Sequence, residues 1–177
     1  MAIQIGAKPD SGFDDPLGML TDCHRRIEHF LHILCIVADR AAARAMTDEE
    51  AAAVQASLQY FRVGGQRHNA DEEQSLFPRL RAVCAAEDAS EISGLESDHQ
   101  EAGVLHAGIE ELYESWIENG AMGVGDQERL SLMTQRLKDL YQQHIQLEEQ
   151  VVFPRATKIL DAKNVAAMGK EFRARRE

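Results

Sequence analysis

Apolar residues recur at alternating spacings of three and four along most of this chain, which is the pattern of one face of an α-helix. The sequence lacks the alternating runs of apolar and polar residues that are typical of strands. The pattern predicts four long helices, beginning near Pro16, Thr47, Ser90 and Asp126, and a short fifth helix over roughly 164–175. Four long helices with short connections indicate an all-α fold, an up-and-down four-helix bundle.

Local signals set several of the helix limits. The segment Thr47–Glu50 has the pattern of a capping box and starts the second helix, which is predicted to run to about Cys84. Gly64-Gly65 should weaken the middle of this helix, and Pro78 should end or kink it, because proline lacks the N–H that a helix interior uses. Gly120 is the expected stop of the third helix.

The length and charge of the chain narrow the possible functions. With 177 residues it is long enough for one domain with a substantial core. We expect the bundle over residues 14–160, after an N-terminal extension over 1–13 and before a short C-terminal helix or tail over 161–177 that packs on it. The formal net charge of −11 opposes binding to nucleic acids and to anionic membranes.

Cysteine usage and the absence of long apolar runs indicate a compartment. The three cysteines, Cys23, Cys35 and Cys84, form no Cys-x-x-Cys pair, so neither a disulfide framework nor a zinc–thiolate site is expected. No apolar run approaches the ~18 residues of a membrane span. Residues 1–12 lack the basic and then apolar layout of a secretory signal. These features predict a cytoplasmic protein.

An internal repeat links the second and fourth helices. The segment His68–Pro78 aligns without gaps on His144–Pro154, and both follow the pattern His-x3-Glu-Glu-Gln-x2-Phe-Pro. The first and third helices each carry a histidine ahead of these segments, at His24 and His99. The chain therefore consists of two helix pairs with the same polar residues.

Each of the four long helices places one histidine on its apolar face, and on two helices a glutamate follows four residues later. Such a spacing puts the imidazole and the carboxylate on one helix face, one turn or ~6 Å apart. Four imidazoles in a core are costly unless each finds a partner, so the pattern predicts a metal site. The predicted ligands are His24, His68, Glu72, His99, His144 and Glu148.

Nitrogen and oxygen ligands without thiolate suit iron, manganese or zinc. The number of ligands indicates two metal ions. If both glutamates bridge, each ion has about four ligands, and octahedral iron would keep open positions for a small molecule such as dioxygen. A single tetrahedral zinc ion would leave ligands unused.

From about Asp14 to Leu160 the chain resembles the hemerythrin-like, or HHE cation-binding, family. The features that carry the resemblance are the two His-x3-Glu segments, each followed by Phe-Pro, and the lone histidines of the first and third helices. The resemblance implies a bundle that holds a non-haem di-iron centre bridged by two carboxylates, with the six residues above as the ligands by position. Oxygen-carrying hemerythrins have a fifth histidine where this chain has Gly103. In this respect the chain is more similar to bacterial HHE proteins and related iron-sensing domains.

The resulting hypothesis is a hemerythrin-like metal-binding protein that binds or senses dioxygen or nitric oxide, or that handles iron. One alternative is a redox-active di-iron enzyme, peroxidase-like or active in iron–sulfur repair, which would act on peroxide or under nitrosative stress. A second alternative is a structural zinc site in an interaction module. The sequence identifies no protein partner.

Five further residues have open roles. His106 could hydrogen-bond to a ligand or line a pocket. Tyr141 could point its hydroxyl toward the metals or simply pack between helices. Glu28 could supply another carboxylate or lie at the surface. Glu73 and Glu149, one step around their helices, are expected to face solvent or to hydrogen-bond to the ligands.

Overall fold

The computed structural model describes residues 10–41, 44–83 and 85–177. Within these ranges the chain is helical and contains no strand. Short π-helical turns, labelled η, interrupt two of the long helices. In chain order the elements are α1 (Pro16–Asp39), α2 (Asp48–Tyr60), η1 (Phe61–Gly65), α3 (Gln66–Asp71), η2 (Glu72–Leu76), α4 (Phe77–Arg81), α5 (Ala86–Asn119), α6 (Val124–Leu147), η3 (Glu148–Val152), α7 (Phe153–Ile159) and α8 (Ala162–Ala174).

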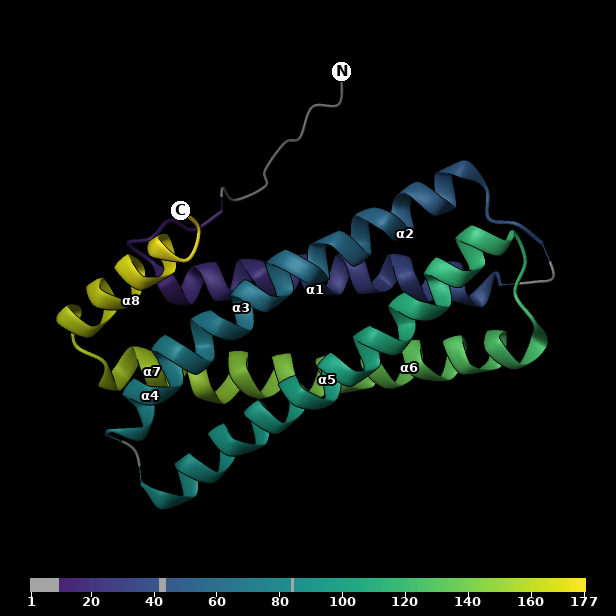
Figure 1. The fold of residues 1–177 in the computed structure, drawn as a ribbon. Helices are drawn as coiled ribbons and strands as arrows, with labels where there is room; N and C mark the ends of the chain where they lie inside the picture. Colours follow the sequence, from purple (N-terminus) through teal and green to yellow (C-terminus); the bar gives the residue numbers. More distant parts are fainter. Residues whose placement is uncertain (1–9, 42–43, 84) are drawn as a thin grey trace.

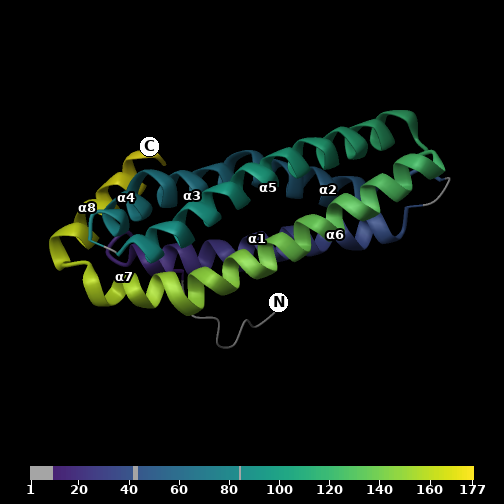
Figure 2. The same ribbon diagram turned by 90° about the horizontal axis from the view of Figure 1, so that it is seen from below.

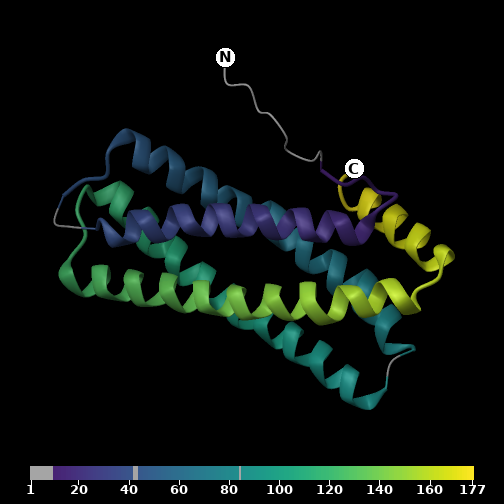
Figure 3. The ribbon, with the colours of Figure 1, turned by 180° about the vertical axis from the view of Figure 1, so that it is seen from behind.

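These elements form four long rods, and the predicted all-α helical bundle is confirmed (Figure 1). The rods are α1, the run from α2 to α4, α5, and the run from α6 to α7. Helix α1 packs against α2 and α6, and α5 packs against the same two helices from the other side. Seen from behind, α1 and α6 lie side by side along the length of the bundle (Figure 3).

The observed ends of the helices match the predicted ends where the sequence contains a capping residue. The Thr47 hydroxyl accepts a hydrogen bond from the Glu50 N–H at 3.1 Å, which completes the predicted capping box. Gly120 ends α5 with a φ of 70°, a left-handed conformation that favours glycine. The predicted start of this helix near Ser90 is four residues late, because Ala85 offers no side-chain cap and therefore no sequence signal.

Of the two outcomes predicted at Pro78, the structure excludes an end of the second helix. The helical run continues to Arg81, and Cys84, the expected end, lies outside the described residues. A π turn precedes both Phe77-Pro78 and Phe153-Pro154, so each proline stands in the first turn of a new α-helical segment. There a missing N–H costs little, because first-turn N–H groups have no partner within their own segment.

Two apolar clusters fill the bundle, with a polar layer between them. On α1, for example, Leu20 belongs to one cluster and Ile27 to the other, and His24 lies between them. The larger cluster contains Leu34, Leu58, Ile109, Tyr113, Trp116 and Leu137, among others. The smaller one contains Leu76, Phe77, Ile92, Leu95, Val152 and Phe172, among others.

Helix α8 crosses the end of the bundle next to the smaller cluster (Figure 2). It buries Met168 and Phe172 in that cluster. At its C-terminal end, Arg175 and Arg176 lie 2.8 Å and 2.6 Å from the buried carboxylate of Asp71. Asp71 directly precedes Glu72, so this helix holds the chain beside a predicted ligand. No helix in the described part of the chain combines the length and apolar character needed to cross a bilayer.

Candidate metal centre

The structure brings all six predicted ligands together in the polar layer of the bundle. Their exposed fractions lie between 0% and 7%, so solvent contributes almost nothing to their environment. They come from α1, α3, η2, α5, α6 and η3, and Glu72 and Glu148 are the first residues of η2 and η3. We call the six residues the His/Glu cluster: His24, His68, Glu72, His99, His144 and Glu148.

Glu72 lies at the middle of this cluster. Its Oε1 is 3.3 Å from Nε2 of His68, and its Oε2 is 3.3 Å from Nε2 of His99. The two carboxylate oxygens therefore face histidines from different helices. This is the arrangement of a carboxylate that can bridge two positions.

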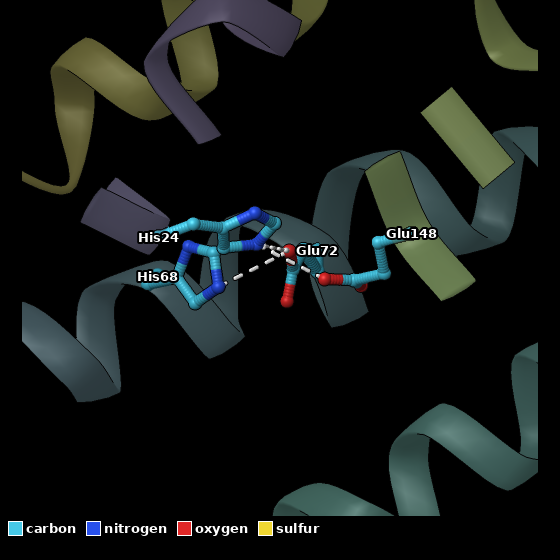
Figure 4. Close-up of side chains that lie close together, drawn as sticks. All are labelled: His24, His68, Glu72 and Glu148. Atoms are coloured by element: carbon cyan, nitrogen blue, oxygen red, sulfur yellow. Dashed lines mark ion pairs between the residues drawn. The ribbon is translucent and has the colours of Figure 1, made fainter. Parts of the chain in front are cut away.

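Glu148 also faces histidines from two helices. Its Oε2 lies 3.1 Å from Nε2 of His24 and 3.3 Å from Nε2 of His144. Figure 4 shows Glu148 and Glu72 converging with His24 and His68. These four residues place one donor atom each within 4.8 Å of one another, and a second group, sharing Glu72, adds His99 and His144.

The donor atoms in the cluster lack protein hydrogen-bond partners. All four carboxylate oxygens are buried without one, and so are the Nε2 atoms of His24, His99 and His144. Each such buried polar atom costs roughly 1–3 kcal/mol when nothing satisfies it. Nitrogen and carboxylate oxygen atoms directed at a common centre are what a transition-metal cation requires, so the residues fit a metal site.

Protonation states in the cluster follow from burial and from the two carboxylates. Burial and the neighbouring Glu148 raise the pKa of Glu72 to about 7. Burial opposes the charged form of His144, but Glu148 and Asp98 together raise its pKa to about 10. The pKa of His68 is well below its usual range, because burial dominates there. Without a cation, the folded cluster therefore retains protons that a cation would displace.

Carboxylates outside the cluster orient three of its histidines. Glu149 lies 2.9 Å from Nδ1 of His24, and Glu73 lies 2.7 Å from Nδ1 of His99. Of the two options left open for these glutamates, the structure shows hydrogen bonding to the histidines. Such outer carboxylates fix the ring and make its other nitrogen a better ligand.

The third outer carboxylate was missed in the sequence. Asp98 lies 3.3 Å from Nδ1 of His144. Its only sequence signal is its place directly before His99, which points to no partner because His144 is on another helix. His68 differs from the other three histidines, since its Nδ1 is buried without a hydrogen-bond partner.

The remaining candidates divide into surface residues and cavity residues. Glu28 is exposed and pairs with Arg25 at 2.8 Å, so it is not part of the cluster. His106 and Tyr141 form a hydrogen bond of 3.0 Å between Nε2 and the hydroxyl. Both line a cavity of about 190 Å³, together with Gly103. For His106 the structure therefore supports the pocket-lining option, and the hydroxyl of Tyr141 bonds to His106 across the space between two helices.

Comparisons with known proteins agree with this geometry. A family model described as the hemerythrin HHE cation binding domain matches residues 15–156, a range that includes the whole His/Glu cluster. An uncharacterized protein of Haemophilus influenzae is 30% identical over 173 residues, which cover 93% of this chain and 92% of that protein.

Proposed function

Because the chain belongs to the hemerythrin HHE cation-binding domain family, we propose that it binds two iron ions in the His/Glu cluster. We further propose that this centre binds or senses a small molecule such as dioxygen or nitric oxide, or takes part in iron handling. The observation that carries the proposal is the sharing of Glu72 between two groups of buried donors. A single ion would leave one of these groups unsatisfied.

The chemistry of the donors supports iron. Four imidazole nitrogens and two carboxylates contain no thiolate, a set that suits iron and also manganese or zinc. Bound iron would supply reversible redox chemistry and an open coordination position for a small ligand. The protein's part is to hold the donors rigidly, which Glu149, Glu73 and Asp98 do through Nδ1 of three histidines.

We propose that a small ligand enters through a cavity near the cluster. The cavity with Gly103, His106 and Tyr141 begins one helical turn beyond His99 on α5. A Cβ added at Gly103 would meet no heavy atom within 4 Å, so this wall is open where oxygen carriers have a further histidine. Burial lowers the pKa of His106 to about 4, so the imidazole is neutral and can either donate or accept a hydrogen bond.

We also propose a cytoplasmic location on the basis of the cysteine usage. Cys23 and Cys35 carry free thiols, as a reducing compartment would keep them. The ligand that we propose for the metal centre is a small diatomic molecule or a peroxide. We propose neither a nucleic acid nor a membrane surface as a partner.

The test is metal analysis followed by spectroscopy. We expect elemental analysis of the protein from its own organism to find about two iron ions per chain, as the two donor groups imply. Adding dioxygen or nitric oxide to the reduced protein should change its absorption spectrum. Turnover of many equivalents of peroxide would instead favour the redox enzyme. A colourless protein loaded with zinc would contradict the proposal.

A further inference from the structure

The internal repeat relates the two halves of the His/Glu cluster. It superimposes the segment that begins at His68 on the segment that begins at His144. His24 and His99 lie on the helix that precedes each segment, 44 and 45 residues before its first histidine. If the outer carboxylates followed the repeat throughout, the two halves of the cluster would be equivalent.

Two outer carboxylates do follow the repeat. Glu73 and Glu149 occupy the same repeat position, and each reaches across to Nδ1 of the histidine on the opposite helix pair. His24 and His99 therefore have the same kind of partner, a glutamate at Nδ1.

The remaining two histidines, His144 and His68, differ in their partners at Nδ1. Nδ1 of His144 faces Asp98, but Nδ1 of His68 is buried with no hydrogen-bond partner. Asp98 directly precedes His99, and the residue that directly precedes His24 is Cys23. A thiol offers no carboxylate oxygen, and the sulfur of Cys23 accepts a hydrogen bond from Arg26 at 3.2 Å instead.

We infer that the two metal positions are unequal and that Asp98 sets the difference. The position at His99 and His144 binds its cation more tightly than the position at His24 and His68. Loss of an outer partner of a metal-binding histidine typically weakens metal binding by about 10- to 100-fold. Glu148 does not offset this, because its Oε2 is within 3.3 Å of histidines in both positions. This inference rests on the proposed two-metal function.

The experiment is a titration of Co²⁺ into the metal-free protein of 177 residues, monitored by isothermal titration calorimetry. We expect two binding events whose dissociation constants differ by about 10- to 100-fold. Asp98→Asn should weaken the tighter event by a similar factor and leave the weaker one unchanged. Asp98→Glu, which keeps a carboxylate, should restore most of the lost affinity.

Glu101→Gln is the matched control. Glu101 is a half-exposed carboxylate on the same helix, paired with Arg136 at 2.6 Å and outside the cluster, so its loss should change neither event. Two equal events in the wild type, or an Asp98→Asn protein with only the weaker event affected, would overturn the inference. Fewer than two bound Co²⁺ ions in the wild type would count against the proposed two-metal function itself.

Discussion

Adjacent glutamates in the repeat have different environments. Glu72 and Glu148 are completely buried in the cluster, whereas Glu73 and Glu149 lie outside it against Nδ1 atoms. We therefore expect Glu72→Ala or Glu148→Ala to lower bound metal from about two ions toward one or none, since each removes donors from both positions.

The measurement is the number of metal ions bound per chain after exhaustive dialysis. Glu73→Ala and Glu149→Ala are the controls. They should keep the stoichiometry and weaken binding by about tenfold, because they remove only an outer partner. If these two glutamates proved essential for stoichiometry instead, the assignment of the inner pair would be wrong.

Four members of the His/Glu cluster could be grouped from the sequence because the spacing of each histidine–glutamate pair is local. A glutamate four residues after a histidine must share its helix face, whatever the rest of the fold does. Asp98 and the hydrogen bond between His106 and Tyr141 could not be found in this way. Each of these contacts joins two helices, so it depends on how the helices are rotated and aligned, which one sequence does not reveal.

At the level of elements, the four helices followed from periodicity, but the π turns did not. Each π turn that precedes a Phe-Pro pair begins on a glutamate of the cluster. A π turn has one extra residue, an effect too small to disturb an apolar pattern followed over several turns. The sequence pattern therefore indicates a break at Pro78, although the turn before it lets the helix continue.

Helix α8 provides a stability prediction. A Cβ at Gly169 would collide with the backbone carbonyl oxygen of Phe13, where the chain packs closely against this helix. Gly169→Ala should therefore lower the free energy of unfolding by about 1–3 kcal/mol, as overpacking does, in spite of alanine's higher helix propensity. Urea denaturation followed by circular dichroism measures this change.

Gly94→Ala is the matched control for that substitution. Gly94 is an exposed helical glycine whose added Cβ would meet nothing within 4 Å. Its replacement should raise the free energy of unfolding by about 0.5–1 kcal/mol. Equal stabilisation by both substitutions would show that the contact of α8 with Phe13 is not tight in solution.

For the whole molecule, the cluster makes stability depend on metal and pH. In the metal-free protein, the pKa values of Glu72, about 7, and His144, about 10, are both raised, so the folded state holds more protons than the unfolded state. At Glu72 this difference extends up to about pH 7, and at His144 it extends from pH 6.5 to about 10. Stability from these groups is complete below their unfolded values and is lost as pH rises through the folded values. The melting temperature of the metal-free protein should therefore fall between pH 7 and 9.

Metal loading should raise the melting temperature and remove most of this pH dependence, because cations replace the protons. Thermal unfolding at pH 7 and 9, with and without a chelator, makes the comparison. Glu72→Gln removes a negative charge that helps to raise the pKa of His144, so the melting temperature of the metal-free variant should fall less over this range. A melting temperature of the metal-free wild type that increases toward pH 9 would contradict the assigned direction.

The polar layer between the two apolar clusters also determines how the four rods can be aligned along their axes. If one helix slid by a turn, its histidine would lie opposite leucines and would lose every polar neighbour, at a cost that the apolar contacts could not recover. A single buried polar residue selects one alignment of a coiled coil in the same way. Leucine at all six positions would bury more apolar surface but would permit several alignments of similar energy. The residues that form the cation site thus also make one arrangement of the bundle preferable to its neighbours.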